Sequence, residues 1–494
     1  MKKAAGIAAG VVIAVGVIAT AGAWYTGTRL EGVLQDAVRQ ANEQFAQSGT
    51  TAEGKPQFSA ELVSLDRHLF SSTAHYRLNV QMPHSQVAHF QLVDHIEHGP
   101  FPLSRVTSLR LTPVMAASNT QLEKTADTEK WFALNKDQTP VTGHAVIHYD
   151  RSSETTFDFL PLEAREPGRT LKFSGLTLQV NGTADAQKYE LNGSMDSLSI
   201  DVAGENGPVH ADASGLTLYS GGTKGQSGFY LGHTELKLAT ANVQVPNAPG
   251  VALKDFSGAG LMQEVEGKLS AEATYQIGGL TLGNQDVGSA QMVWKLDNFD
   301  IQATKSLYAL YLSKIAPQQQ AAAAAGVPLQ VRLSDVDQKQ LDADLLALLA
   351  AKPHVELQRL SLKTANGESQ ASMALDFTSP GSLDNQTQDL GKKAIGLLDA
   401  KVSLSKPMLA DLATVQAHLQ GQTDKDAVAL QAKNVSDSVG GMAVMTQLGK
   451  VEGDNITSRL HYADGVVDFN GQKMTPEQFA GFIANLLGQE QAQR

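Results

Sequence analysis

TLKFSGLTLQVNGTADAQKYELNGSMDSLSIDV, residues 170–202, alternates apolar and polar side chains along most of its length. The part that reads NGTADAQ is rich in turn-forming residues, so the pattern predicts two antiparallel strands joined by a turn. Because successive side chains of a strand point to opposite faces, the resulting sheet has one apolar and one polar face. The same alternation extends from about Phe58 to Asp300.

The tetrapeptide GLTL occurs three times in this region, beginning at Gly175, Gly215 and Gly279. The unequal separations exclude a strict solenoid repeat. They favour a series of similar antiparallel strands that form a long, curved sheet. Such a sheet needs no catalytic residues to serve as a scaffold or a binding surface.

Helices interrupt and follow the strands. Capping residues and helical periodicity predict helices that begin at Ser334 and near Ser405. A hairpin is expected through Asn366-Gly367 and another through Asp464-Gly465. The expected helices cover residues 304–315, 334–352, 407–419, 426–450 with an interruption at Gly440-Gly441, and 476–487, and residues 318–328 are expected to form a low-complexity connector.

Residues 4–23 carry no charge, and at about 1.5 Å per residue a helix of this length spans the roughly 30 Å hydrocarbon core. Trp24 and Tyr25 lie where an interfacial aromatic belt is expected, and Lys2 and Lys3 predict a cytoplasmic N-terminus. A cleaved signal peptide is the alternative, although the apolar run is longer than the usual signal core.

Two features near the N-terminus bear on self-association. Gly6 and Gly10 form a G-x-x-x-G pair, which lets two helices approach closely, although such a pair arises easily by chance in an Ala/Gly-rich segment. Leu30, Leu34 and Val38 belong to an apolar helical face. This helix either docks on the body of the protein or acts as a stalk that pairs with a copy of itself.

The predicted fold class is mainly β with α (α+β). It combines an N-terminal transmembrane helix, a long curved antiparallel sheet, helical insertions and C-terminal helices. The segments in chain order are a transmembrane anchor (1–25), an amphipathic helix or stalk (26–50), an antiparallel β region (51–302) and a mixed α+β region that continues the sheet (303–494).

Composition excludes several functions. The net charge of −12 argues against nucleic acid, whose binding needs clustered Lys and Arg. The absence of cysteine excludes disulfides, thiolate catalysis and Cys-based zinc sites. No nucleotide-binding or nucleophile motif is complete, so no catalytic residue and no cofactor is predicted.

The strongest candidate for chemistry is VDHIEHGPFPL, residues 93–103, because six of the thirteen histidines fall between His68 and His98. In a regular strand His95 and His98 point to opposite faces, so they cannot bind one metal together. HIEH also fits neither H-E-x-x-H nor H-x-x-E-H. A metal site assembled across strands is the alternative to structural histidines at a strand edge.

The prolines in this stretch have a geometric role. Pro100 and Pro102 each fix φ and lack an N–H group, and Gly99 and Phe101 precede them and are restricted to extended geometry. The segment therefore predicts the end of a strand.

Several motifs together resemble the YdgA/YihF family of Gram-negative bacteria, a domain of unknown function. They are GAWYTGTRLE (22–31), EHGPFPL (97–103), LDAKVSL (398–404) and YADGVVDFNGQKMTPEQF (462–479). The motif residues are His98, Gly99, Pro100, Phe101 and Pro102, and Asn470, Gly471, Gln472, Lys473 and Met474. The chain has DHIEHGPFPL where a shorter DHGPFPL-like form is expected.

The resemblance implies a protein anchored in the inner membrane, with its bulk in the periplasm and no defined catalytic residues. We therefore predict a single-pass inner-membrane protein, not an enzyme, whose periplasmic β-rich domain is an envelope scaffold or binding module. The expected partners are the membrane, and a lipid, an envelope protein or a second copy of the chain. The alternative is a metal-dependent hydrolase that uses the region His68–His98.

Overall fold

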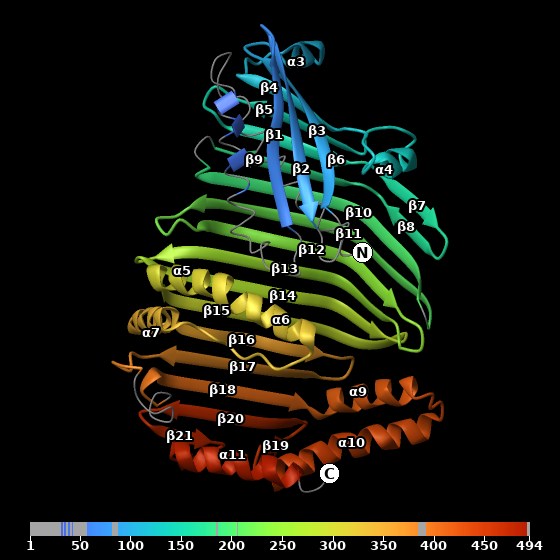
Figure 1. Ribbon diagram of the computed structural model, residues 1–494. Helices are drawn as coiled ribbons and strands as arrows, with labels where there is room; N and C mark the ends of the chain where they lie inside the picture. The colour runs from blue at the N-terminus through green and yellow to red at the C-terminus, as the bar shows by residue number, and fades with distance from the viewer. Residues whose placement is uncertain are drawn as a thin grey trace. The chain divides into compact units, whose positions relative to one another are not determined.

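The computed structural model describes residues 31, 32, 34, 35, 38, 39 and 42, and then 57–81, 87–183, 186–204, 206–383 and 392–491. The chain divides into two compact units (Figure 1). The first contains residues 1–201, 214–232 and 309–333, and the second contains residues 202–213, 233–308 and 334–494. The division falls within three strands, which are β10 (Lys188–Gly204), β11 (Gly207–Lys224) and β12 (Tyr230–Gln244).

The first unit is built on antiparallel strands. From β1 to β6 each strand pairs with the next in the sequence; β6 then pairs with β9, and β9 pairs with β10. Strands β7 and β8 form a separate hairpin, and two short helices connect strands. The bounds are β1 (Gln57–Arg67), β2 (Ser71–Gln81), β3 (Val87–His98), α3 (Leu103–Thr107), β4 (Ala116–Leu122), α4 (Glu129–Leu134), β5 (Val141–Ile147), β6 (Ser153–Phe159), β7 (Leu162–Glu166), β8 (Arg169–Phe173) and β9 (Leu176–Gly182).

The sheet of the first unit curls, so that β1, β2 and β3 cross over β5, β6 and β9 (Figure 1). Tyr76 and Leu92 from the crossing strands and Phe157 from β6 are therefore buried in one core. Leu34 and Val38 belong to the same core, so the described part of the amphipathic segment is docked. Asn42 fixes it to β1, because its side chain accepts from Ala60 N (2.8 Å) and donates to Ala60 O (2.9 Å).

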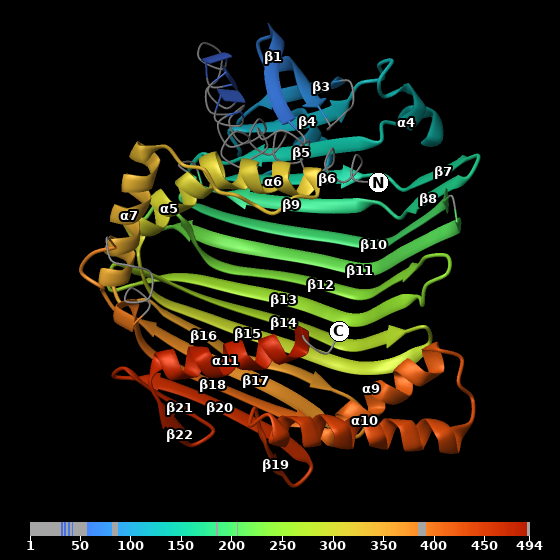
Figure 2. The same cartoon turned by 60° about the horizontal axis from the view of Figure 1, so that its bottom comes forward.

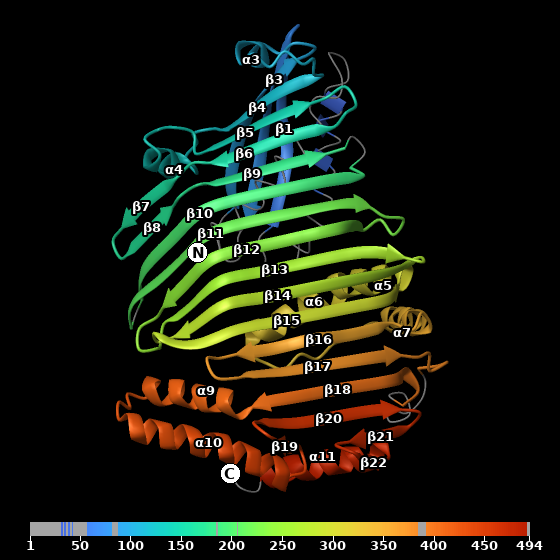
Figure 3. The same ribbon diagram turned by 180° about the vertical axis from the view of Figure 1, so that it is seen from behind.

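The second unit contains a continuous antiparallel series in which β13 to β18 each pair with the next, followed by β20, β21 and β22, while β19 pairs with β20. Figure 3 shows these strands from behind. The bounds are β13 (Val251–Val265), β14 (Lys268–Leu282), β15 (Gln285–Asp300), β16 (His354–Lys363), β17 (Glu368–Phe377), β18 (Ile395–Ser405), β19 (Lys450–Glu452), β20 (Asn455–Ala463), β21 (Val466–Phe469) and β22 (Gln472–Met474).

The helices after β15 largely follow their predicted limits. They are α5 (Ile301–Leu310), the π-helical turn η1 (Tyr311–Ile315), α6 (Ala316–Ala325), α7 (Asp335–Ala350), α9 (Lys406–Leu419), α10 (Lys425–Met445) and α11 (Pro476–Gln491). Ser334 and Ser405 are N-caps as expected, and their hydroxyls accept hydrogen bonds from Asp337 N and Met408 N.

Two expectations for this region are wrong. The connector is largely helical, because its alanine run has a high helix propensity, and the helix ends at Gly326 in the left-handed conformation. The pair Gly440-Gly441 does not interrupt α10. Gly440 is buried, and a β-carbon there would lie 3.6 Å from Val451, so tertiary packing stabilises the helix at a residue of low propensity.

The predicted fold class is wrong in its N-terminal element. Antiparallel strands predominate, and the segment expected to form a transmembrane helix, residues 4–23 with Gly6 and Gly10, lies outside the described residues. Within the described ranges, no helix combines the length and the apolar composition that a membrane crossing requires. The longest of them, α10, carries charged residues along its length and packs against α9.

The end of β3 depends on Gly99. Its N–H donates to Met115 O at 2.8 Å, and the Gly99-Pro100 peptide bond is cis. A β-carbon at this position would lie 1.9 Å from Val114 O, which is main chain and cannot rotate away. The residue before Pro100 must therefore be glycine in this backbone arrangement.

We expect Gly99→Ala to lower the local free energy of unfolding of the first unit by about 2 kcal/mol or more, because the backbone at Val114 must shift. Hydrogen exchange of the β3 and β4 amides measures this change. The control is Gly441→Ala in α10, where a β-carbon meets nothing within 4 Å. Equal protection of β3 and β4 in Gly99→Ala and the parent chain would contradict the packing argument.

Candidate binding surfaces

The second unit has one face of its sheet that is almost wholly apolar. The register aligns side chains in rows that run across the strands, so the apolar positions of neighbouring strands meet. We call the three central rows the apolar face. They are Met262, Ala271, Leu296, Val355, Leu375 and Leu398; Ala273, Trp294, Leu357, Met373 and Ala400; and Tyr275, Met292, Leu360, Ala371 and Val402.

One end of this face is covered by α11 (Figure 2). Phe479 and Phe482 of that helix contact the Phe469 ring, with ring centroids 5.4 and 5.8 Å away. They belong to a small core that includes Leu398 and Tyr462. Helix α11 thus covers the apolar side of the last strands of the sheet.

The third row of the apolar face is the most exposed. Leu360 is 46% exposed, Tyr275 43% and Val402 38%, and Trp294 and Met373 are half-buried. Exposed apolar area costs roughly 25 cal/mol per Å², so this exposed row, beside a half-buried one, favours a ligand that covers it. The rows contain no hydrogen-bonding group apart from the Trp294 indole N–H and the Tyr275 hydroxyl, which suits an apolar ligand.

The opposite face of the same strands is polar and is organised around Asp399. One carboxylate oxygen contacts Arg459 Nη2 and His461 Nδ1, each at 3.1 Å, and the other contacts Lys401 Nζ at 3.2 Å. Burial alone raises the pKa of Asp399. The hydrogen bonds from Arg459, His461 and Lys401 outweigh this effect and hold the pKa below its usual range. The Asp399–Lys401 ion pair is thus part of a larger network.

Two of the family-like motifs meet on this polar face, at a pocket of about 640 Å³. LDAKVSL contributes the side chains of Lys401 and Ser403, and the closing motif contributes Asn470 and Gly471. Asn470 and Gly471 have φ of 54° and 88°, as a tight turn between β21 and β22 requires.

The residues of the closing motif stabilise the turn or lie on β22. The Asn470 side chain accepts from Arg459 N at 2.8 Å, and Asn470 N donates to Arg459 O at 2.9 Å, so the turn fixes the strand that carries Arg459. Gln472 and Lys473 are exposed on β22, and Met474 packs against the small core under α11.

The other predicted motif, residues 98–102, lies in the first unit. His98 Nε2 and Ser72 Oγ are 3.0 Å apart, and Pro102 is the N-cap residue of α3. Glu97 accepts a hydrogen bond from Ser104 N at 2.9 Å, which ties the strand end to the start of that helix. Pro102 is buried, whereas Pro100 and Phe101 are exposed. The contacts of these residues end β3 and orient α3.

The histidines of β2 and β3 divide between the two faces of the sheet, as the alternation predicts. His95 Nδ1 lies 3.3 Å from Thr73 Oγ1, while His98 contacts the neighbouring Ser72 on the other face. His84 lies outside the described residues. Among the residues that are described, no group of three or more His, Asp or Glu side chains is placed to hold a metal ion.

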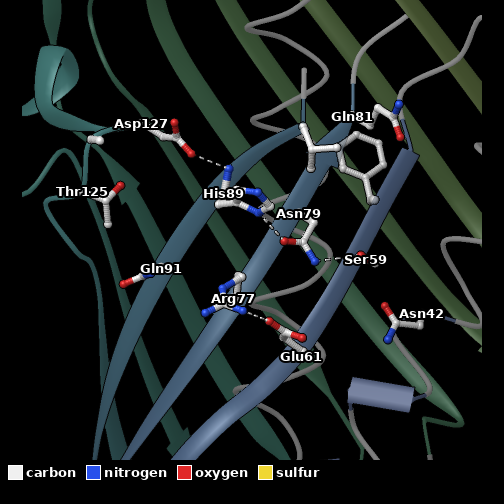
Figure 4. A pocket seen from close by; sticks show the side chains of 13 residues that line it. Asn42, Ser59, Glu61, Arg77, Asn79, Gln81, His89, Gln91, Thr125 and Asp127 are labelled. Atoms are coloured by element: carbon white, nitrogen blue, oxygen red, sulfur yellow. Dashed lines mark hydrogen bonds and ion pairs between the residues drawn. The ribbon is translucent and has the colours of Figure 1, made fainter. Parts of the chain in front are cut away.

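Figure 4 shows a polar pocket of about 820 Å³ on the exposed face of β1, β2 and β3. His89 Nδ1 lies 2.7 Å from Asn79 Oδ1, and Asp127 accepts from the main-chain N–H of His89, not from its ring. Arg77 forms an ion pair with Glu61. The His89 ring therefore contacts an amide and not a carboxylate, whereas His75 Nδ1 of β2 lies 3.6 Å from Glu123 Oε1.

Sequence reasoning missed the buried carboxyl group of Asp94, the eighth residue of β3. Its side chain lies in the core, where Ser118 Oγ and Thr120 Oγ1 donate to it, the latter at 3.0 Å. Burial raises the pKa of Asp94, and the two hydroxyl hydrogen bonds oppose this only in part. Tyr76 is also buried, which together with the nearby Asp94 charge raises the pKa of its hydroxyl well above the usual value. A signal was present in the sequence: in a strictly alternating strand, Asp94 falls on the same side as the apolar residues Leu92 and Ile96.

We expect Asp94→Asn to stabilise the first unit at neutral pH by roughly 1–3 kcal/mol. The folded state binds the Asp94 proton more tightly than the unfolded chain does, because the folded pKa is raised. The free energy of unfolding of the parent chain therefore falls as pH rises from the ordinary Asp pKa through the folded one. Asparagine has no such pH dependence, so the difference should disappear at acidic pH.

Hydrogen exchange of the β3 and β4 amides as a function of pH measures this effect. Asp150→Asn is the matched control in the same unit, because hydrogen bonds from Ser152 lower the pKa of Asp150 and its replacement should destabilise. A loss of protection in Asp94→Asn at neutral pH would show that the charge at Asp94 stabilises the core.

The comparisons with known proteins agree with the resemblance in the motifs. The family model described as "Bacterial protein of unknown function (DUF945)" matches residues 1–477. Protein YdgA of Escherichia coli is 28% identical over 491 residues, which cover 97% of this chain and 96% of that protein. The uncharacterized protein YihF of Escherichia coli is 25% identical and covers 96% of this chain and 97% of its own length.

An uncharacterized protein of Haemophilus influenzae is 26% identical over 211 residues, which are 43% of this chain and 55% of that protein. No solved structure matches the chain. Because the family model covers nearly the whole sequence, the chain belongs to the DUF945 family of bacterial proteins of unknown function.

Proposed function

We propose that the chain is a non-catalytic binding protein whose apolar face in the second unit holds an apolar ligand, with lipid acyl chains as the ligand class. The observation that supports the proposal is the run of adjacent apolar rows in which Tyr275, Leu360 and Val402 remain exposed. An acyl chain would bury this area at about 0.8 kcal/mol for each buried CH2 group.

The chemistry of the face favours a chain-like apolar ligand over a polar small molecule. Polar recognition needs converging donors and acceptors, and these lie on the opposite face, where Asp399 holds Arg459, His461 and Lys401 in ion pairs. The rows run across the strands, so a bound chain would cross several strands and contact one side chain from each. Its specificity would come from length and shape.

The cellular location belongs to the same proposal and rests on sequence alone. Lys2 and Lys3 before an uncharged segment favour an inner-membrane location with the N-terminus in the cytoplasm and the bulk in the periplasm. A lipid-binding surface is consistent with such a place. The competing occupant of the apolar face is a second copy of the chain, which would also bury the exposed rows.

We expect a photo-crosslinking residue at Leu360 to recover lipid from cells, because this side chain is exposed on the apolar face. Mass spectrometry of the adducts identifies the ligand. The same residue at Gln370, which is exposed on the polar face of the adjacent strand, is the control and should recover no lipid. Adding Met373→Glu should lower the lipid yield at Leu360 by about tenfold, since a charge opposes apolar contact.

Three results would overturn this proposal. The first is the absence of lipid at Leu360, and the second is an equal yield at Leu360 and Gln370. The third is a chain-to-chain adduct at Leu360 together with a dimer mass, which would assign the face to a second copy of the protein.

A further inference from the structure

Three connections meet at one end of the first unit. They are the β1–β2 turn (residues 68–70), the β3–β4 connection (residues 99–115, which contains α3) and the β5–β6 turn (residues 148–152). Main-chain hydrogen bonds join them, from His98 N to Phe70 O at 2.9 Å and from Met115 N to Ile147 O at 2.8 Å. We call these three segments the tip, and Figure 1 shows α3 there, beside the end of β3.

The tip exposes large apolar side chains that the fold does not use. Leu69 and Leu109 are each 83% exposed, Phe70 is 76% exposed and Leu103 is 70% exposed. Phe101 and Leu111 are exposed as well. Single exposed apolar residues are common on protein surfaces, but a cluster of this kind marks an interaction site.

The backbone at Leu109 fixes the position of one of these exposed side chains. Its φ is 58°, in the left-handed region that a leucine rarely adopts. Strain of this kind persists where the surrounding structure or a function requires it. Here the end of α3 requires it: Leu109 follows the C-cap Ser108, Leu109 N donates to Val106 O at 3.0 Å, and Arg110 N donates to Arg105 O at 2.8 Å. The turn therefore holds the exposed Leu109 side chain in a set position.

The charge of the tip indicates which kind of partner it fits. Residues 98–115 contain Arg105 and Arg110 and no acidic residue, in a chain of net charge −12. The nearest acid along the chain, Glu97, is engaged by the main-chain N–H and the hydroxyl of Ser104. The β5–β6 turn adds one acidic residue, Asp150, and one basic residue, Arg151, so it leaves the net charge of the tip positive. Exposed apolar side chains beside arginines match the interfacial region of an anionic membrane, where apolar groups enter the acyl boundary and cations contact phosphates.

A second copy of the chain fits the tip less well. A symmetric dimer through the same surface would place two surfaces that each carry Arg105 and Arg110 face to face, and like charges oppose such contact. We therefore propose that the tip is a docking surface that inserts into a lipid membrane with anionic phosphate headgroups. This role is separate from ligand binding on the apolar face, because it uses other residues in the other unit.

The test uses the full-length chain, which contains no cysteine, so that one introduced thiol can be labelled alone. Leu109→Cys carries a polarity-sensitive fluorophore, and vesicles contain lipids with a quenching group in the acyl chain. We expect strong quenching with vesicles of phosphatidylcholine and phosphatidylglycerol, and about tenfold weaker binding to phosphatidylcholine alone. High salt should weaken the binding to anionic vesicles, because it screens the arginine–phosphate attraction.

The control label is at Gln179→Cys on β9, an exposed position in the same unit away from the tip, and it should stay unquenched. Because quenching is read at the labelled residue, binding of vesicles through another part of the chain does not imitate the result. Arg110→Gln in the Leu109→Cys background should lower affinity for anionic vesicles several-fold and leave binding to phosphatidylcholine unchanged. Leu103→Glu should reduce quenching with both vesicle types, since it removes apolar contact.

Both side chains are exposed, so the variants should retain the hydrogen-exchange protection of β3 and β4, which serves as the folding control. Equal quenching at positions 109 and 179 would overturn the proposal, as would the absence of quenching at 109 in a folded chain. A fluorescence change at 109 that depends on protein concentration without vesicles would assign the tip to a second copy instead.

Discussion

Antiparallel pairing keeps apolar residues of neighbouring strands in common rows, and the core of the first unit and both sheet faces of the second depend on that constraint. In the second unit Leu296, Val355 and Leu375 occupy one such row because each is paired directly with the next. A shift of one residue in any strand would turn its apolar side chains to the polar face. The register therefore maintains both the apolar face and the ion-pair network of Asp399 behind it.

The two units use this constraint in different ways. In the first unit the sheet curls, so that Tyr76 and Leu92 meet Phe157 across a closed core. Leu34 and Val38 fill part of this core. In the second unit the cover is local: α11 contributes Phe479 and Phe482 at one end, and the row of Tyr275, Leu360 and Val402 remains exposed. A closed core stabilises its unit, whereas an open apolar face leaves free energy available for a ligand.

The histidine-rich stretch VDHIEHGPFPL shows what the alternation of side chains along a strand can predict and what it cannot. It correctly separated His95 from His98 and placed the end of β3 at the glycine and the prolines. Side-chain pattern could not show that Asp94 lies in a closed core, because that depends on which strands cross over it. Similarly, the low helix propensity of glycine predicted an interruption at Gly440-Gly441, whereas packing against Val451 and Ile456 keeps α10 continuous.

The sequence by itself determined the antiparallel strands, their two unlike faces, most helix limits and the family, because these follow from short-range patterns and from motifs. Tertiary structure alone decided which apolar residues are covered. Leu178 and Leu360 are both apolar strand residues, yet the first is buried and the second is exposed. The difference arises from curvature of the sheet and from helices distant in sequence, which no local pattern contains. For the same reason, local pattern did not predict the exposed tip. It contains residues 99–102 of HGPFP and forms only where three separate connections meet at one end of the unit.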